Sequence, residues 1–262
     1  MEKLEILHEL GFKDAFYSGA CNEAIQICDE VDFCDFASIE SLEEAKAGAA
    51  IIGDDDYRHL VLILSGILHS YGKYLERGIG DDIYFDTMSD AFVWAELYRR
   101  LEGRVGLKET GWLLFHIRLE LFRLGRLQFQ LDDTPLQFRS VLDGKKVIQV
   151  HIPDIGPLYA DECMESFRKA KSFYPEMLPF ICDSWLLEPE LEKVLSPSSN
   201  ILSFQKLFHI FHVDRTNPQC HQRVFEFSMR RDTRLQRNIL SSEAEGTVFG
   251  VGYGYILPEE IV

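Results

Sequence analysis

The sequence lacks most features that assign a chain to a common class. No stretch reaches the roughly 18–20 uninterrupted apolar residues of a membrane-spanning helix, and the most apolar run, Leu60 to Leu68, directly follows a charged segment. The chain contains no Cys-x-x-Cys pair, Gly-x-Ser-x-Gly elbow, P-loop, dinucleotide fingerprint or His-Glu-x-x-His motif. These absences argue against a zinc ribbon, an α/β-hydrolase, a P-loop nucleotide-binding protein and a zinc protease.

Positive charge is scarce. The 27 basic and 43 acidic residues give a net charge of −16. Residues 1–100 hold 8 of the basic and 21 of the acidic residues, a net of −13, so residues 101–262 carry only −3. A chain this acidic is a poor general ligand for nucleic acid or an anionic membrane. We expect neither as a partner, and we expect any anionic ligand to bind the second part.

Six cysteines are present, at positions 21, 28, 34, 163, 182 and 220. The first residues alternate charged with apolar side chains and contain no hydrophobic core of a signal peptide. We therefore expect a cytoplasmic protein with reduced, mostly buried thiols.

Apolar spacing of about 3.6 residues predicts helices in the first part. They lie near Leu4–Phe12, over the largely apolar segment Tyr57–Tyr74, after Ser89, and over Thr110–Leu124 with Gly125 as C-cap.

The spacing then shortens to about two. Leu127–Leu131 and Leu136–Leu142 are predicted strands, and Asp143-Gly144 is a predicted hairpin turn into a third strand over residues 145–153. Later in the chain we expect a helix from Ala160, strands at Phe180–Leu186, Ile201–Val213, Arg223–Met229 and Thr247–Ile256, and short helices near Leu191 and Leu235.

Histidines offer the clearest candidate sites. His209, His212, Cys220 and His221 suggest a metal, but strand alternation would place His209 and His212 on opposite faces, so we predict no metal site.

His116 and Glu120, four residues apart on the predicted helix, are either an acid–base pair or a polar pair that orders a domain junction. His151 closes a predicted strand beside a Gly-Pro loop. It is either a ligand-binding residue or a histidine bonded to the loop backbone. The segment Cys182–Trp185 is interpreted as a buried strand.

Several segments closely resemble a bacterial family of acyltransferases whose activity is inferred from its fold. The matching segments are WLLFHIRLELFRLGRLQF (112–129), HIPDIGPL (151–158), CDSWLLEPELEKVL (182–195), SNILSFQKLF (199–208) and TRLQRNIL (233–240). The resemblance is close over residues 90–262 and looser before them.

The resemblance implies an α+β fold, with a helical N-terminal domain (1–143) and a mixed-sheet C-terminal domain (144–262) similar to the GNAT N-acetyltransferases. It implies that acetyl-CoA or another acyl-CoA lies where strands Lys146–Ile152 and Phe180–Leu186 diverge. The pyrophosphate would sit on loop Pro153–Leu158 and the following helix N-terminus. The implied cofactor-binding residues are Ile152, Ile155, Gly156 and Leu158, and the candidate catalytic residues are His151, Ser184, Glu120 and His116.

The loop departs from the usual Arg/Gln-x-x-Gly-x-Gly/Ala pattern of GNAT enzymes. It reads Asp154-Ile155-Gly156-Pro157, in which prolines remove N–H donors and an aspartate repels phosphate. Two functions therefore remain open. One is an acyl-CoA-dependent N-acyltransferase that acts on an amine. The other is a non-catalytic ligand-binding or protein-interaction module on a degenerate GNAT scaffold.

The segment Arg99–Arg126 stands out by its charge. It holds seven basic and three acidic residues, a net of +4. One interpretation is that this segment attracts an anionic ligand such as CoA to a domain junction near His151, Gly156 and Ser184. The other is that its arginines form ion pairs with the acidic first part.

Overall fold

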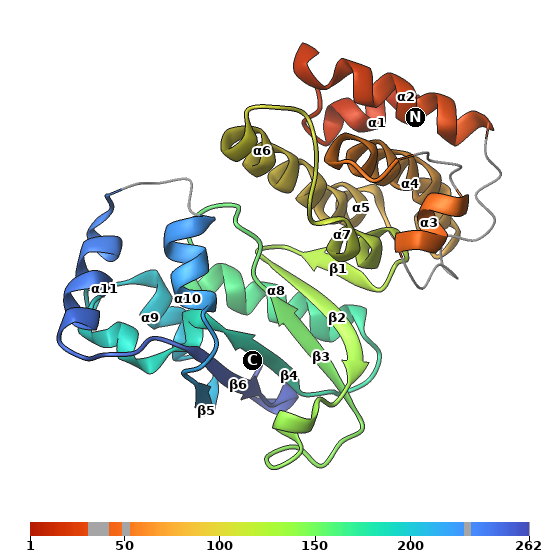
Figure 1. Ribbon diagram of the computed structural model, residues 1–262. Helices are drawn as coiled ribbons and strands as arrows, with labels where there is room; N and C mark the ends of the chain where they lie inside the picture. Colours follow the sequence, from red (N-terminus) through yellow and green to blue (C-terminus); the bar gives the residue numbers. More distant parts are fainter. Residues whose placement is uncertain (31–41, 49–52, 228–231, 262) are drawn as a thin grey trace. The chain divides into compact units, whose positions relative to one another are not determined.

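The computed structural model describes residues 1–30, 42–48, 53–227 and 232–261 (Figure 1). The chain divides into two compact units, Met1–Arg123 and Leu124–Val262. The boundary predicted from the sequence lies at Asp143–Gly144 instead. The two differ because the strand Leu127–Asp133 pairs with Lys146–His151 and so belongs to the second unit.

The first unit is built from helices. Its most buried element is α4, which Asp55 caps by accepting a hydrogen bond from the Arg58 amide at 2.9 Å. Leu60 to Leu68 are all buried, which confirms the apolar helix predicted there. The helices are α1 (Lys3–Glu9), α2 (Ser18–Glu30), α3 (Leu42–Gly48), α4 (Asp56–Glu76), α5 (Asp81–Met88), α6 (Asp90–Glu102) and α7 (Thr110–Ile117), with a 3-10 turn at Ala15–Tyr17.

The single helix predicted over Thr110–Leu124 is wrong. Helix α7 ends at Ile117, Leu119 takes a left-handed backbone conformation (φ 59°), and strand β1 follows at Leu121–Leu124. Gly125 (φ 86°) is the turn between β1 and β2, where a Cβ atom would lie 2.9 Å from the Ser166 hydroxyl. Apolar residues at nearly every position fit a buried strand as well as a helix, so their spacing misleads.

One mixed sheet forms the framework of the second unit. Its strand order is β1-β2-β3-β4-β6-β5, so β5 is an edge strand. Strands β3 and β4 are parallel, whereas β2 with β3, β4 with β6 and β5 with β6 are antiparallel. The strands after β1 are β2 (Leu127–Asp133), β3 (Lys146–His151), β4 (Phe180–Ser184), β5 (His209–Asp214) and β6 (Val251–Ile256).

Helix α8 (Ala160–Phe173) covers one face of this sheet, which we call the α8 face. The Phe167 ring lies 5.7 Å from that of Phe129 on β2 and 5.2 Å from that of Phe180 on β4. The other face, which we call the opposite face, is partly covered by the β2–β3 connection, whose Phe138 packs in a cluster with Val147 and Ile181.

Three predicted strand assignments in the second unit are wrong. Residues 136–142 hold a 3-10 turn at Leu136–Phe138, so β2 and β3 form an antiparallel pair without a tight turn at Asp143-Gly144. Residues 201–213 begin as helix α9 (Asn200–Gln205), capped by the Ser199 hydroxyl, before β5 starts. The described part of the predicted strand 223–229 lies largely in a π-helical turn at Gln222–Glu226, and residues 228 and 229 lie outside the described residues.

Other expected elements of the second unit form. Helix α11 covers Arg234–Ala244, and the predicted helix near Leu191 is a 3-10 helix at Pro189–Lys193. The short α10 at Gln219–His221 was not expected. The glycine-rich strand predicted near the end is β6. A Cβ atom at Gly252 would lie 2.1 Å from the Leu187 carbonyl oxygen, so glycine lets the turn Trp185–Leu187 pack on this strand.

Candidate active site

The parallel strands β3 and β4 separate toward their C-terminal ends. They are registered only at Ile148 with Phe180 and at Gln149 with Ile181. Both strands continue, to His151 and Ser184, yet the described residues beyond these two pairs form no further β3–β4 pairing. The divergence that the family resemblance implied is therefore present, and the described backbone beyond these two pairs does not link β3 to β4.

Side-chain alternation sorts the residues of this divergence between the two faces. The α8 face carries the side chains in phase with Phe180, and the opposite face carries those in phase with Ile181. The α8 face thus presents Ile148, Val150, Cys182 and Ser184, and the opposite face presents Gln149, His151 and Asp183. Where β3 and β4 diverge, the α8 face is therefore mostly apolar and the opposite face is polar.

Arg126 holds the loop that follows β3. Its guanidinium donates to three loop carbonyls, at 3.0 Å to Pro153, 2.8 Å to Gly156 and 2.9 Å to Pro157. Its own amide donates to the Ser166 hydroxyl on α8 at 2.7 Å. Only 9% of Arg126 is exposed. The local sequence around Arg126 gives no signal of this role, because there Arg126 is one of seven basic residues in the segment Arg99–Arg126.

These contacts fix where the loop amides point. In a trans peptide the C=O and the following N–H point in opposite directions. The N–H groups of Asp154 and Leu158, which follow carbonyls bound by Arg126, therefore point away from the guanidinium. The Ile155 amide is already used, because it donates to the Pro153 carbonyl at 3.0 Å.

The α8 N-terminus lies directly after this loop. Its N-cap, Tyr159, provides no side-chain hydrogen bond, so the first-turn amides are not capped from there. Uncapped helix amides and the helix dipole favour an anion. Asp161 and Glu162 in the same turn, and the exposed Asp154, oppose one.

The predicted cofactor-binding residues occupy this region. Ile152 follows β3 at the divergence, and the Leu158 amide points away from Arg126. Gly156 adopts φ 124°, which favours glycine, and directs its carbonyl to Arg126. Ile155 contributes no amide, because its N–H is used within the loop. Their role in binding stays a prediction.

Asp183 is a polar residue that the sequence analysis placed only in a buried strand. It lies on the opposite face and is exposed to solvent. The Gln149 side chain donates to its Oδ1 at 3.4 Å. Neighbouring protein removes enough water from the carboxyl to raise its pKa above the ordinary value, and the Gln149 hydrogen bond only partly offsets this. A carboxylate that is easier to protonate than usual is suited to accept a proton.

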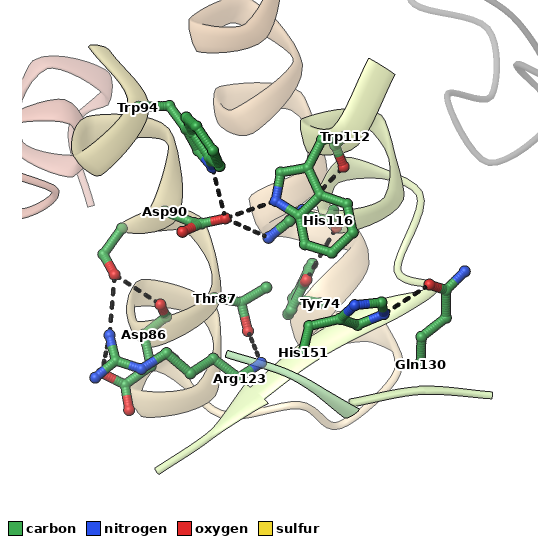
Figure 2. A network of polar contacts seen from close by, with 11 residues as sticks. Tyr74, Asp86, Thr87, Asp90, Trp94, Trp112, His116, Arg123, Gln130 and His151 are labelled. Atoms are coloured by element: carbon green, nitrogen blue, oxygen red, sulfur yellow. Dashed lines mark hydrogen bonds and ion pairs between the residues drawn. The ribbon is translucent and has the colours of Figure 1, made fainter. Parts of the chain in front are cut away.

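His151 and Ser184 lie at the ends of the two diverging strands. His151 Nε2 faces the Gln130 amide oxygen at 3.3 Å (Figure 2). The Ser184 hydroxyl accepts a hydrogen bond from the Leu186 amide at 3.2 Å, and 8% of the residue is exposed. That bond leaves the hydroxyl proton of Ser184 able to donate. Both residues stay in the candidate site.

His116 belongs to a different, buried cluster in the first unit (Figure 2). Its Nε2 lies 3.3 Å from Asp90 Oδ2 and its Nδ1 lies 3.3 Å from the Trp112 carbonyl. The same Asp90 oxygen accepts from the indoles of Trp94 and Trp112, at 3.3 and 2.8 Å. Both imidazole nitrogens face acceptors and 1% of the residue is exposed, so His116 is poorly placed to act as a base.

Glu120 does not share a helix face with His116, because α7 ends before it. Instead it accepts a hydrogen bond from Arg118 at 2.7 Å. Other basic side chains of the Arg99–Arg126 segment also pair with acids, such as Arg99 with Asp14 at 3.1 Å. These pairs favour the interpretation that the segment neutralises acidic neighbours. A ligand site at the domain junction stays a prediction.

A β-bulge corrects the expected geometry of the β5 histidines. The register shifts between Ile210 and His212, so His209 opposes Tyr255 and His212 opposes Tyr253. The two tyrosines are two residues apart on β6, and both histidines therefore lie on one face rather than on opposite faces. Even so, within the described parts of the chain no three His, Cys, Asp or Glu side chains group as metal ligands.

The described cysteines are free thiols, and Cys34 lies outside the described residues. Cys21, Cys163, Cys182 and Cys220 are buried, and burial raises the pKa of the Cys182 thiol well above its usual value. No helix in the described ranges is long and apolar enough to span a membrane.

Comparison with known proteins identifies the class. The sequence model of the N-acyltransferase N-terminal domain matches residues 13–119, and that of the GNAT-like C-terminal domain matches residues 121–256. The chain therefore belongs to the family of proteins that carry this GNAT-like C-terminal domain. A search of curated proteins finds no match.

Solved structures share the fold over nearly the whole chain. One is an acyltransferase mutant in complex with octanoyl-CoA, 21% identical, with a TM-score of 0.70 over 97% of this chain and 87% of that one. Another is an acyltransferase in complex with decanoyl-CoA and teicoplanin, 19% identical, with a TM-score of 0.66 over 98% of this chain and 99% of that one. At this identity the likeness establishes the α+β architecture.

Proposed function

We propose that the protein is an acyl-CoA-dependent N-acyltransferase. The observation that carries the proposal is the divergence of β3 and β4 beside a loop whose carbonyls accept hydrogen bonds from Arg126. The extended arm of an acyl-CoA would bond to backbone groups left between the strands. Its thioester would then lie between Ile152 and Ser184. Structural neighbours that bind octanoyl-CoA or decanoyl-CoA support an acyl-CoA as donor.

The donor's pyrophosphate would sit on the amides that follow β3. Those of Asp154 and Leu158 point away from Arg126, and those of the first α8 turn have no side-chain cap. Because α8 covers the α8 face, the donor approaches from that side. The Ser184 hydroxyl lies on the same side, where it can give its proton to the departing CoA thiolate.

The buried, free cysteines support the cytoplasm as the location, a reducing compartment in which acyl-CoA is available. We propose an amine as acceptor and neither nucleic acid nor a membrane as partner, in line with the net charge of −16.

A non-catalytic binding module is the second candidate. The acidic residues at the proposed pyrophosphate position favour it, because Asp154, Asp161 and Glu162 repel phosphate. Such a module would keep the GNAT-like framework and bind a ligand other than CoA.

Titration calorimetry with octanoyl-CoA and acetyl-CoA tests the proposal. The variant Ala160→Pro removes one N–H donor at the first position of α8, where proline is tolerated, and the Tyr159 backbone suits a following proline. A hydrogen bond to a charged group contributes about 1.5–3 kcal/mol, so we expect affinity to fall roughly tenfold or more.

Asn200→Pro is the matched control, since it places proline at the first position of α9. It should leave acyl-CoA affinity unchanged. If neither acyl-CoA binds the wild type at millimolar concentration, the binding module replaces the enzyme. Equal affinity of Ala160→Pro and the wild type would refute the pyrophosphate position.

A further inference from the structure

We propose that Asp183 is the catalytic base of the acyl transfer. We further propose that the acceptor is a primary amine that binds as its ammonium ion on the opposite face of the sheet, against Tyr253 and His212. The inference rests on the proposed function, because it takes the thioester to lie between β3 and β4.

The position of Asp183 follows from strand alternation. Ser184 and Asp183 are consecutive on β4, so their side chains leave opposite faces at the point where β3 has moved away. A thioester between the strands is then reached from the α8 face by Ser184 and from the opposite face by Asp183. The donor occupies the α8 side, which leaves the Asp183 side for the acceptor.

Aromatic rings continue this face beside Asp183. Tyr253 on β6 is registered directly opposite Asp183, and His212 on β5 is registered opposite Tyr253. The rings of His212 and Tyr253 lie 5.4 Å apart. Tyr253 is half-buried and His212 is exposed, so the Tyr253 ring presents surface beside the carboxylate and the His212 ring continues that surface one strand further out.

The β-bulge in β5 creates this arrangement. It brings His209 and His212 to the same face as Tyr255 and Tyr253, with His209 and Tyr255 rings 5.1 Å apart. A regular strand would have turned one of the two histidines away. We call these four rings the ring strip.

The charge near this strip favours a cation. Burial raises the pKa of the Tyr253 hydroxyl, and the negative charges of Asp183 and Asp214 raise it further. Two histidines lie on the same face of the sheet as Asp183: His151 at the end of the neighbouring strand β3, and His212 on β5, one strand beyond Tyr253. An ammonium ion is attracted both to the carboxylate and to the faces of aromatic rings within about 6 Å.

The geometry distinguishes Asp183 from the histidine on the neighbouring strand. His151 Nε2 faces the Gln130 amide oxygen at 3.3 Å and so acts there as a donor. The Gln149 amide that faces Asp183 is itself a donor, so the carboxylate is held in place as an acceptor. Its exposure allows the accepted proton to pass to water.

The reaction balances with these groups. Asp183 takes one proton from the acceptor ammonium, and the freed nitrogen lone pair attacks the thioester carbonyl carbon. The C–N bond forms and the C–S bond breaks. The thiolate takes the Ser184 proton, while the amide nitrogen loses its second excess proton and restores Ser184 through water. The products are an N-acyl amide, free CoA and the proton that Asp183 releases.

Octanoyl-CoA and 2-phenylethylamine are suitable probes, with release of the CoA thiol and formation of the amide as readouts. General base catalysis contributes about 10²–10⁴-fold. We therefore expect Asp183→Asn to lower kcat by that factor, with octanoyl-CoA affinity within twofold of the wild type. Asp183→Glu should restore part of the rate. Asp132→Asn, an acidic residue on β2 distant in register from the divergence, should retain full activity.

The pH dependence separates a chemical role from a structural one. The wild-type kcat should rise with pH as Asp183 ionises, and Asp183→Asn should lose this rise. The neutral isostere 2-phenylethanol should not be acylated.

Three results would overturn the inference, and calorimetry together with the amide assay separates them. If octanoyl-CoA does not bind the wild type, the proposed function itself fails. If it binds but no amide forms, the acceptor class is wrong. If Asp183→Asn keeps the wild-type rate and pH profile while His151→Gln loses them, the base is His151 and the assignment of Asp183 is wrong.

Discussion

The two units each contain an aspartate beside aromatic and imidazole side chains, with opposite consequences. Asp90 in the first unit has 4% of its surface exposed, and one of its oxygens faces three N–H donors. Asp183 in the second unit is exposed and faces one side-chain donor at 3.4 Å. The first carboxylate has its hydrogen-bonding capacity taken up by the fold, whereas the second keeps capacity for a ligand.

The comparison shows why residue type alone does not locate a catalytic group. An aspartate near histidine and aromatic side chains suggests acid–base chemistry in both units, although only Asp90 contacts a histidine, His116. Proton transfer needs a group that can exchange its proton with the substrate and then with water. The cluster of Asp90 and His116 has no such access, since His116 is 1% exposed. It is suited to fixing α6 against α7.

The largest expected effect is on the buried cluster. Asp90→Ala leaves the His116 imidazole and two indole N–H groups without their acceptor. Removal of one partner from a buried pair costs about 3–5 kcal/mol. We expect the free energy of unfolding to fall by about that amount in urea denaturation, while octanoyl-CoA affinity of the folded protein stays unchanged.

Asp86→Ala is the control for this prediction. Asp86 lies on α5 in the same unit, is about half exposed and is 3.9 Å from Arg123. An exposed pair of this kind contributes at most about 1 kcal/mol. If Asp90→Ala unfolds no more easily than Asp86→Ala, the cluster is not a structural one and the contrast with Asp183 disappears.

The next effect concerns the loop after β3. Arg126→Gln keeps a polar side chain but removes the charge and most of the three bonds to the Pro153, Gly156 and Pro157 carbonyls. Hydrogen bonds to charged groups contribute about 1.5–3 kcal/mol. We expect a stability loss of this size and at least a tenfold weaker affinity for octanoyl-CoA, measured by calorimetry.

Arg123→Gln separates this role from a general effect of positive charge. Arg123 donates to the Ser89 hydroxyl at 3.2 Å and lies 3.9 Å from Asp86, both in the first unit. If affinity falls equally in both variants, the positive field of the Arg99–Arg126 segment attracts the donor. If it falls only in Arg126→Gln, the order of the loop matters.

Sequence patterns predict the helices and strands of this protein better than they predict which side chains meet. The apolar helix α4, the strand β6 with its alternate glycines and the order of helices before sheet all follow from local spacing. The strand β5 was predicted too long, because the apolar run from Ile201 fits helix and strand alike until Ser199 caps α9. A bulge inserts one residue without any clear sequence signal, so the shared face of His209 and His212 could not be predicted.

The candidate site was located only in part. The family resemblance indicated the diverging strands and the loop, and therefore His151, Gly156 and Ser184. It did not indicate Arg126 or Asp183. The contacts of Arg126 join residues 27 or more positions apart. The pKa of Asp183 depends on protein packed around it in three dimensions. Neither property is encoded in a short motif.

The smallest expected effect is that of the Asp183 charge on the free energy of unfolding. Its pKa is raised in the folded protein, chiefly because neighbouring protein displaces part of the water around the exposed carboxylate. The folded state therefore holds the proton more tightly than the unfolded chain. Protonation of Asp183 therefore stabilises the folded protein. This contribution is fully present below the ordinary pKa of about 3.9 and is lost as the pH rises through the raised pKa of the folded state. At pH 7 the charged carboxylate is slightly unfavourable.

Asp183→Asn should thus be as stable as the wild type at pH 7 or slightly more so, by no more than about 0.5 kcal/mol because the side chain is exposed. This gain should shrink toward pH 4.

Asp214→Asn should behave in the opposite way, since hydrogen bonds from the Thr216 side chain and amide lower the pKa of Asp214. Its loss of stability should be present at pH 7 and diminish as the pH falls through that lowered pKa. Thermal melting of both variants at pH 4 and pH 7 measures the two signs. A stability loss for Asp183→Asn at pH 7 would mean that the fold uses this carboxylate as it uses Asp90, which would remove the physical ground for treating the two aspartates differently.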